Sequence, residues 1–343
     1  MPYLRHSLLT TVLVMLVISI GSVTAFRAWL NQPMGQVAAG YVLEIPPGTP
    51  VSSVARQLAR DGLLDYPRLL SLQAQLAGQA TQIRAGEYEL SAGTTPRQLL
   101  EQLVAGKVRL HSLTIVEGWT VYQLLGAVRH NPQLSHTLQA DGPIELALEL
   151  QLDFPHAEGL FFPDTYRFPK GLSDRDLLLQ AHAKMLRQLE IAWEHRQPGL
   201  PLKSAYQALI LASIVERETA LGSERPLIAG VFIRRLQRNM RLQADPTVIY
   251  GLGPDFDGNL TRPDLESDTP YNTYTRRGLP PTPIALPGQA SLQAAVNPAA
   301  GDTLFFVATG KPDGSHVFST TVAEHNAAVA RYLAVLRQRR QEN

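Results

Sequence analysis

The chain has 343 residues, of which 45% are hydrophobic and 18% are charged, a composition typical of a folded protein with two or more domains. Because 31 Lys and Arg nearly balance 30 Asp and Glu, no broad basic surface is available for a nucleic acid. The absence of cysteine excludes disulfides, thiolate nucleophiles and Cys-rich zinc sites. The nine histidines form no metal-ligand motif, and we expect neither a metal nor another cofactor.

A long apolar segment lies near the amino terminus. Leu8 to Phe26 contains no charged residue and is flanked by Arg5 and Arg27. At about 1.5 Å per residue, a helix of this length nearly crosses the ~30 Å hydrocarbon core of a bilayer. We therefore predict that residues 1–30 form a cytoplasmic stub and a membrane anchor. A cleaved signal peptide is the alternative, since Val23 to Ala25 resembles a small-residue cleavage site.

One pattern recurs three times after residue 40: an extended apolar piece, a Gly, a Thr and a segment with helical periodicity. The copies are Leu43 to Leu58, Leu90 to Leu103 and Leu113 to Leu125. Gly permits a tight turn, and Thr or Ser can cap the helix that follows. We predict a strand, a turn and a capped helix in each copy. Ordinary connections of an α+β fold explain this pattern as well as true internal repetition does.

Residues 41–108 resemble a small LysM-like module, in which a strand, a Gly-Thr turn and a helix carry a glycan-binding surface. A domain boundary is expected near Arg109 to Ser112, because the preceding helix ends at Gly106. A group of aromatic residues follows, namely Phe161, Phe162, Tyr166 and Phe168. These rings either face a sugar or pack in the core. A long helix is then predicted from Asp174 to Glu194.

The next predicted helix, Ser204 to Leu221, is apolar nearly all round and should be buried. It contains Glu216 and Glu218, which point to nearly opposite faces at about 100° per residue. Glu218 falls on the face with the larger aliphatic side chains, where desolvation would raise its pKa from about 4.3 toward neutrality. Glycoside cleavage requires such a general acid. For Glu216 we expect a buried ion pair with Arg217, Arg225 or Arg234.

Several motifs together resemble the endolytic murein transglycosylase family, also called YceG-like. They are ASIVERET, the helix ERPLIAGVFIRRL, the predicted strand and turn RLQADPTVIYG, and YNTYTRRGLPPTPIALPG at 271–288. The resemblance covers roughly residues 110–337 and implies a YceG-like catalytic domain over 110–340. The fold class expected for the chain is therefore α+β: a transmembrane helix, a small LysM-like α/β module and a mixed α+β catalytic domain.

The resemblance implies that the enzyme cuts the β-1,4 bond between N-acetylmuramic acid and N-acetylglucosamine within nascent glycan strands. It leaves 1,6-anhydro ends, which would terminate strand elongation. The family's catalytic glutamate is the second one in the ASIVERET block, and here that position is Glu218. The implied partners are peptidoglycan strands, the membrane and peptidoglycan synthases. The implied location is the inner membrane, with the catalytic domain in the periplasm.

Six further residues are predicted substrate contacts, because amides, hydroxyls and phenols bind acetamido and sugar hydroxyl groups. They are Gln243, Asp245, Tyr271, Asn272, Thr273 and Tyr274. Asp245 also suits a turn before Pro246, while Asn272 and Thr273 could instead satisfy backbone groups of the irregular stretch 251–289. Members of the family that the chain resembles commonly have Thr where this chain has Ala244, so a hydroxyl contact at this position is not expected here.

A transglycosylase needs only one carboxylic acid, which donates a proton and then removes one from the C6 hydroxyl of the muramic residue. Two alternatives remain open. A muramidase-type hydrolase needs a second carboxylate, about 5 to 5.5 Å away for retention or about 6.5 to 9.5 Å away for inversion, for which Asp245 is the candidate. A non-catalytic scaffold would hold glycan through residues 41–108. The remaining chain is predicted to complete the fold with a hairpin, 304–309 and 315–319, and a helix from Thr321 to about Arg339.

Overall fold

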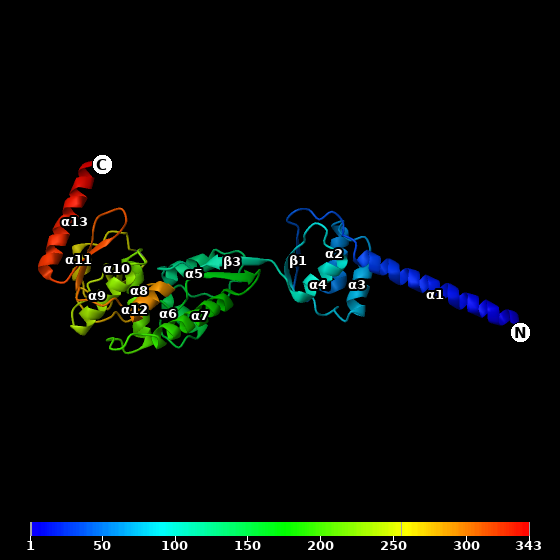
Figure 1. Ribbon diagram of the computed structural model, residues 1–343, viewed down its shortest axis with the longest axis horizontal. Coiled ribbons are helices and arrows are strands. Elements are labelled where there is room, and N and C mark those ends of the chain that lie inside the picture. Colours follow the sequence, from blue (N-terminus) through cyan, green and yellow to red (C-terminus); the bar gives the residue numbers. More distant parts are fainter. Residues whose placement is uncertain (1, 255, 343) are drawn as a thin grey trace. The chain divides into compact units, whose positions relative to one another are not determined.

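The computed structural model describes residues 2–254 and 256–342 (Figure 1). Met1 of the predicted stub, residue 255 of the predicted catalytic domain and Asn343 lie outside the described residues. The chain divides into two compact units. Unit 1 comprises residues 1–111 and 168–171, and unit 2 comprises residues 112–167 and 172–343. Helices and strands mix in both units, which confirms the predicted α+β class.

Unit 1 contains a long helix, three short helices and a two-stranded sheet. The elements are α1 (Pro2–Leu30), β1 (Val42–Ile45), α2 (Val51–Arg60), α3 (Pro67–Leu76), β2 (Gly86–Glu89) and α4 (Pro96–Ala105). β1 and β2 are antiparallel, and Leu43 lies opposite Tyr88. Both side chains are fully buried against α2, α3 and α4. Unit 1 therefore has a hydrophobic core of its own.

Helix α1 has an apolar stretch, Leu8–Leu30, with a mean hydropathy of 2.3. This length and composition suit either a single-pass anchor or a signal sequence. The end of α1 is fastened to the rest of unit 1. Leu30 is buried and Trp29 packs on the core, while the Arg97 side chain donates to the Asn31 side-chain oxygen at 3.1 Å.

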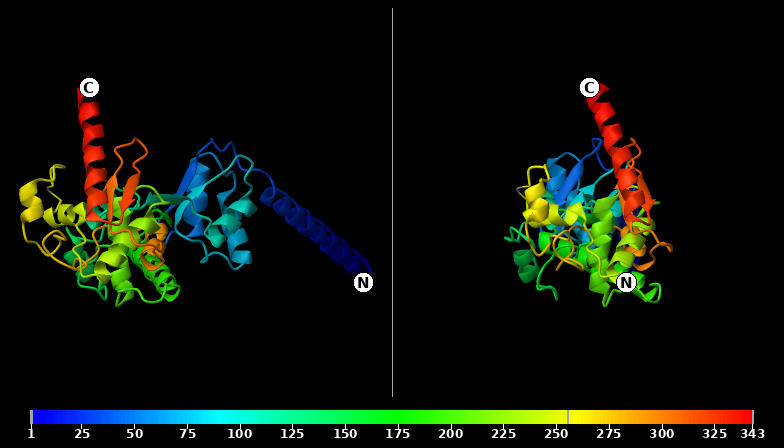
Figure 2. Two further views of the ribbon diagram at one scale, coloured as in Figure 1. Left: turned by 60° about the vertical axis from the view of Figure 1, so that its left-hand side comes forward. Right: turned by 90° about the vertical axis from the view of Figure 1, so that its left-hand side faces the viewer.

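Unit 2 is built around a buried helix. Two short strands, β3 (Leu110–Thr114) and β4 (Thr165–Pro169), pair with each other, and each has residues in both units. Its other elements are α5 (Val121–Arg129), α6 (Pro143–Leu150), α7 (Asp174–Glu194), α8 (Ala205–Glu218), α9 (Arg225–Gln237), α10 (Asp245–Leu252), α11 (Arg262–Glu266), α12 (Gln289–Val296), β5 (Phe305–Ala308), β6 (His316–Ser319) and α13 (Val322–Glu342). Helix α8 packs against α7, α9, α10 and α12, and its residues 208–215 are all buried, as predicted. The antiparallel hairpin β5–β6 lies beside α13 (Figure 2).

All three copies of the Gly-Thr pattern form the predicted turn and helix, and a strand precedes each turn, but in the second copy that strand, β2, ends at Glu89, before the predicted piece begins. Their glycines, Gly48, Gly93 and Gly118, have φ angles of 77°, 84° and 78°, in the left-handed region that favours glycine. Thr95 and Thr120 cap α4 and α5, each with a Gln three residues later completing a capping box. Helix α2, after the first copy, has no side-chain cap. The copies thus share their turn and differ in their caps.

Two predicted elements end or fold differently. Helix α8 stops at Glu218 because Thr219 is extended, so Leu221 does not belong to the face that carries Glu218. The segment predicted as strand and turn is helix α10, Asp245–Leu252. An acidic residue and an early Pro are both favourable in a first helical turn, which explains why Asp245 and Pro246 begin a helix here.

The aromatic residues of 158–169 belong to the core. Phe161 and Phe168 are at most 1% exposed and Phe162 is 8% exposed. The Tyr166 hydroxyl donates to the carbonyl of Phe162 at 2.7 Å. Three of the four rings therefore cannot face a sugar, and the core interpretation is the one the structure supports.

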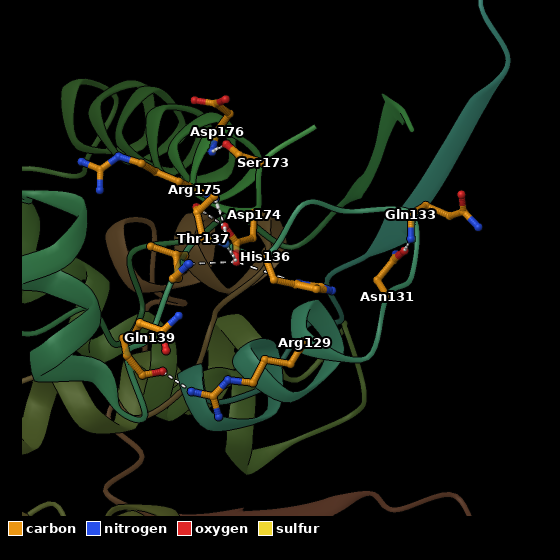
Figure 3. Close-up of polar contacts among 12 residues, drawn as sticks. Arg129, Asn131, Gln133, His136, Thr137, Gln139, Ser173, Asp174, Arg175 and Asp176 are labelled. Atoms are coloured by element: carbon orange, nitrogen blue, oxygen red, sulfur yellow. Dashed lines mark hydrogen bonds and ion pairs between the residues drawn. The ribbon is translucent and has the colours of Figure 1, made fainter. Parts of the chain in front are cut away.

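Asp174, the first residue of α7, holds the loop between α5 and α6 (Figure 3). Its buried carboxylate accepts hydrogen bonds from the backbone and hydroxyl of Thr137 and from the backbone of Leu138 and Arg175. Burial alone would raise the pKa of Asp174, but these hydrogen bonds outweigh it and hold the pKa below its usual value. The ionised carboxylate is therefore the form that stabilises the fold.

We expect Asp174→Asn to lower the free energy of unfolding at pH 7 by about 1–3 kcal/mol, because an amide cannot accept all of these bonds. A carboxyl with a lowered folded-state pKa stabilises the fold above about pH 4, and this contribution is lost as the pH falls through the folded-state value. The difference from wild type should therefore shrink below pH 4. Urea denaturation of the full-length protein in detergent at pH 7 and pH 3 measures it. The control is Asp176→Asn, which makes the same charge change at an exposed position of α7; an equal loss there would contradict the prediction.

Candidate active site

The carboxyl end of α8 opens into a cavity of about 480 Å³ within unit 2. Polar and charged side chains come mainly from α8, α9, α10 and the segments around them, and the hairpin contributes an apolar wall. The lining residues are Glu218, Arg235, Leu242, Gln243, Asp245, Tyr274, Phe305, Phe306, Val307, Ala308, His316, His325 and Val329. A cavity with a few polar groups beside an apolar wall is typical of a ligand site.

Glu218, the last residue of α8, is the acid of this cavity. Burial raises its pKa to about 8, the negative charge of Asp245 adds to the rise, and Arg235 opposes it. Among the described residues, no group forms a hydrogen bond with the Glu218 carboxyl, so no partner within the protein holds its proton. At neutral pH this carboxyl is therefore protonated and able to donate its proton to a group that enters the cavity.

Asp245 and Tyr274 form a pair next to Glu218. The Tyr274 hydroxyl donates to the Asp245 carboxylate. Burial and the adjacent carboxylate raise the pKa of Tyr274, so the phenol keeps its proton. Because the phenol donates to it, Asp245 is held as an acceptor, and its negative charge faces the same space as Glu218.

Arg235 ties the two walls of the cavity together. It is 6% exposed, and its guanidinium donates to the carbonyls of Leu304 and Leu242, both at 2.7 Å. It also lies 3.4 Å from the side-chain oxygen of Gln243, whose φ of 52° is unusual for a residue other than glycine. The guanidinium therefore places a buried positive charge near Glu218 and holds the residue directly before β5.

Glu216 has the structural role expected of it. Its carboxylate lies 2.8 Å from the Arg225 guanidinium, and its other oxygen accepts the backbone N–H of Gly288 at 2.9 Å. The side chain is 5% exposed and does not line the Glu218 cavity. The two glutamates of α8 therefore serve different surroundings, as their positions on opposite faces predicted.

A third glutamate, Glu158, was not singled out by its sequence pattern. It is fully buried, and burial raises its pKa to about 7 despite opposing hydrogen bonds. Its two oxygens accept the Val121 N–H at 3.1 Å, and one also accepts the Tyr250 hydroxyl. These bonds connect α5 to α10 inside the core. Glu158 is absent from the residues found to line the Glu218 cavity, so a raised pKa alone does not make an acid available to a substrate.

Three of the six predicted contacts, Gln243, Asp245 and Tyr274, share the cavity with Glu218. The other three do not line it. The Tyr271 hydroxyl pairs with that of Thr282 at 2.8 Å. The Asn272 amide donates to three backbone carbonyls, and the Thr273 hydroxyl accepts the Ala244 N–H at 3.0 Å.

Asn272 and Thr273 are 0% and 2% exposed, so they satisfy backbone groups in the way that the alternative interpretation anticipated.

Sequence reasoning missed Arg235 and the hairpin side of the cavity. Arg235 lies in a helix with several arginines, and nothing in that pattern distinguishes it. Phe305, Phe306 and His316 belong to a hairpin that was assigned to fold completion. The hairpin residues line the same cavity as Glu218 only because the chain folds back from far along the sequence.

Comparison with known proteins identifies the family to which the chain belongs. The YceG-like family matches residues 43–331, and the chain belongs to that family. It is 30% identical over 310 residues to the endolytic murein transglycosylase of Bacillus subtilis, covering 85% of this chain and 84% of that protein. It is 27% identical to the endolytic murein transglycosylase of Streptococcus pneumoniae R6, covering 84% of this chain and 58% of that longer protein.

A solved structure agrees with this assignment. The crystal structure of a yceG-like protein from Listeria monocytogenes is 30% identical in sequence to the chain. It matches with a TM-score of 0.52 over 85% of this chain and 99% of that one. The chain thus belongs to an enzyme family, and the Glu218 cavity is the candidate active site.

The raised pKa of Glu218 has a consequence for stability. Between about pH 4.5 and pH 8 the folded chain holds a proton on Glu218 that the unfolded chain has released. Stability therefore falls as the pH rises through this window. Glu218→Gln removes the penalty, and we expect a higher melting temperature at pH 8, by about 2–4 °C for each kcal/mol recovered. Differential scanning calorimetry at pH 5 and pH 8 measures it.

Glu216→Gln is the matched control for this prediction, since it makes the same change two residues away on the same helix. It leaves Arg225 without its closest carboxylate, and we expect it to lower stability by about 1–3 kcal/mol at both pH values. The assignment of the titrating group would be wrong if both variants gained stability, or if the gain of Glu218→Gln were the same at pH 5.

Proposed function

We propose that this protein is a lytic transglycosylase of peptidoglycan and that Glu218 is its catalytic acid and base. The substrate is the β-1,4 bond between N-acetylmuramic acid and N-acetylglucosamine within a glycan strand. The observation that carries the proposal is a glutamic acid with a pKa of about 8, without a hydrogen-bonding partner among the described residues, at a cavity in a YceG-like chain. Cutting inside a nascent strand would end its elongation.

The proposed reaction uses one carboxyl group twice. Protonated Glu218 donates to the glycosidic oxygen while the bond from that oxygen to C1 of the muramic residue breaks. The resulting carboxylate removes the proton of the C6 hydroxyl, whose oxygen attacks C1 of the same ring. The products are a 1,6-anhydro end and a free hydroxyl on the glucosamine, and no water is consumed.

The other charged groups of the cavity suit the charge that develops during cleavage. Positive charge builds up at C1 and the ring oxygen as the bond breaks. Asp245 presents a negative charge to the space shared with Glu218, which favours such a transition state. Gln243 and Tyr274 can bind acetamido and hydroxyl groups of the sugars. We therefore assign these three residues to substrate binding and charge stabilisation.

A muramidase-type hydrolase is the second candidate, and the observation in its favour is the second carboxylate in the cavity, Asp245. Such an enzyme would activate water and leave reducing ends. The Asp245 carboxylate already accepts the hydroxyl of Tyr274, so one of its oxygens is occupied and not free to bind a water, which is why we place the transglycosylase first.

We also propose that α1 is a single-pass anchor in the inner membrane and that the rest of the chain lies in the periplasm. Residues 41–108 would act as a LysM-like glycan-binding module, supported by an antiparallel strand pair covered by short helices in unit 1. Peptidoglycan synthases are the expected protein partners, because they produce the strands on which the enzyme would act.

Mass spectrometry of uncross-linked glycan strands tests the reaction. The full-length protein in detergent is preferable to a truncated one, because Trp29 and Leu30 pack into unit 1. We expect 1,6-anhydromuramic ends from wild type and a loss of at least about 100-fold in rate for Glu218→Gln, the usual contribution of a general acid. Reducing ends would support the hydrolase. Intact strands from wild type would leave only a scaffold role.

The pH dependence of kcat/KM tests the role of Glu218 as an acid. The carboxyl must be protonated to donate, so activity should fall as the pH rises through about 8, where Glu218 ionises. Removing the Asp245 charge removes one cause of the raised pKa, so Asp245→Asn should move this limb to lower pH. Rates followed by chromatography of the anhydro products between pH 5 and pH 10 measure both. If the alkaline limb of the pH profile does not move in Asp245→Asn, the group that titrates there is not Glu218.

A further inference from the structure

We propose that His316 binds the sugar strand in the Glu218 cavity, and that Glu224 positions it by fixing which ring nitrogen carries the proton. The inference rests on the proposed function, because the ligand is the N-acetylated glycan of that reaction. His316 lines the cavity. Glu224, directly before α9, contacts His316 and is not among the lining residues. Glu224 is therefore a positioning residue and His316 a substrate contact.

The Glu224 carboxylate joins three parts of the site. It is 8% exposed, and one oxygen accepts the backbone N–H of His316 at 2.8 Å. The other oxygen lies 2.7 Å from Nδ1 of the His316 ring. That oxygen also accepts the hydroxyl of Thr219, the residue directly after Glu218, at 3.4 Å. The same carboxylate thus links the end of α8 to strand β6 and orients the ring between them.

These contacts determine the tautomer of His316. An ionised carboxylate can only accept hydrogen bonds, so Nδ1 must carry the proton. In the neutral ring, Nε2 is then an acceptor. Nε2 forms no hydrogen bond with any of the described residues. It is also not among the buried side-chain atoms of that part of the chain that lack a partner, so it is not buried. It is available to a donor that enters the cavity.

The surroundings of Nε2 fit a sugar. Phe306 lines the same cavity, and the His316 ring meets it edge to face, with centroids 5.5 Å apart. An aromatic wall can pack against the C–H face of a pyranose, while a neutral acceptor nitrogen takes a hydrogen bond from a sugar hydroxyl.

The first experiment changes the tautomer and keeps the shape. In Glu224→Gln the amide can donate to Nδ1, which moves the ring proton to Nε2 and makes that nitrogen a donor. We expect ¹⁵N NMR of histidine-labelled full-length protein to show this exchange of the two nitrogens. KM for glycan strands should rise about tenfold, the size of one lost hydrogen bond, with kcat changed less than KM. A tautomer exchange without any change in KM would overturn the proposal.

The second experiment removes the ring and separates binding from fold. In a Glu218→Gln background, His316→Ala should weaken binding of uncross-linked strands about tenfold. The control is His182→Ala, because His182 bonds the Leu160 carbonyl at 3.0 Å in the same unit and does not line the cavity. Urea midpoints report stability for both variants. Equal loss of binding in both, in step with their stability, would show that Glu224 and His316 form only a structural latch.

The two proposals fail in different ways. If wild type releases no anhydro ends but His316→Ala still weakens strand binding, the proposed reaction is wrong and His316 remains a glycan contact. If wild type releases anhydro ends and neither Glu224→Gln nor His316→Ala alters KM or binding, the reaction stands and this inference is rejected.

Discussion

The burial of α8 is the constraint on which unit 2 and its cavity depend. Its residues 208–215 are fully enclosed by neighbouring helices, so the helix cannot rotate or shift without opening the core. The helix ends at Glu218, where the extended Thr219 turns the chain away. A rigid, buried helix thus places one carboxyl group at the edge of the core. The same low polarity that stabilises α8 raises the pKa of the acid at its end.

Three glutamates of unit 2, Glu158, Glu216 and Glu218, show how surroundings separate roles. Glu216 has a guanidinium and a backbone N–H, so its charge is fully compensated. Glu158 has hydrogen bonds to both oxygens and joins two helices. Glu218 has neither kind of partner among the described residues and is the one that meets the cavity. Natural proteins commonly give up stability at a functional group in this way.

Sequence patterns predicted elements whose causes are local. The caps at Thr95 and Thr120, the turns at the three glycines and the α7 and hairpin segments follow from short-range chemistry. Helix α10 lies in a segment that was predicted as a strand and turn, because the Asp-Pro pair that begins the helix suits a turn equally well. The division of Glu216 and Glu218 followed from helical geometry alone.

Long-range features of the site had no local cause. Arg235 and His316 reach the cavity from a later helix and from the hairpin, and the fate of Asn272 and Thr273 depended on which backbone groups folding left unpaired. Hydrogen-bonding side chains in an irregular loop can serve a ligand or the loop itself, and composition does not distinguish these uses. The choice between them therefore required the folded chain.

The way α1 enters unit 1 has a mechanical consequence. Leu30 is buried, Trp29 packs on the core, and Arg97 holds Asn31, so no slack chain separates the helix from the core of unit 1. If α1 lies in a bilayer, a change in the tilt of α1 also changes the orientation of the rest of unit 1. The thickness of the lipid layer would then set the angle between unit 1 and the membrane.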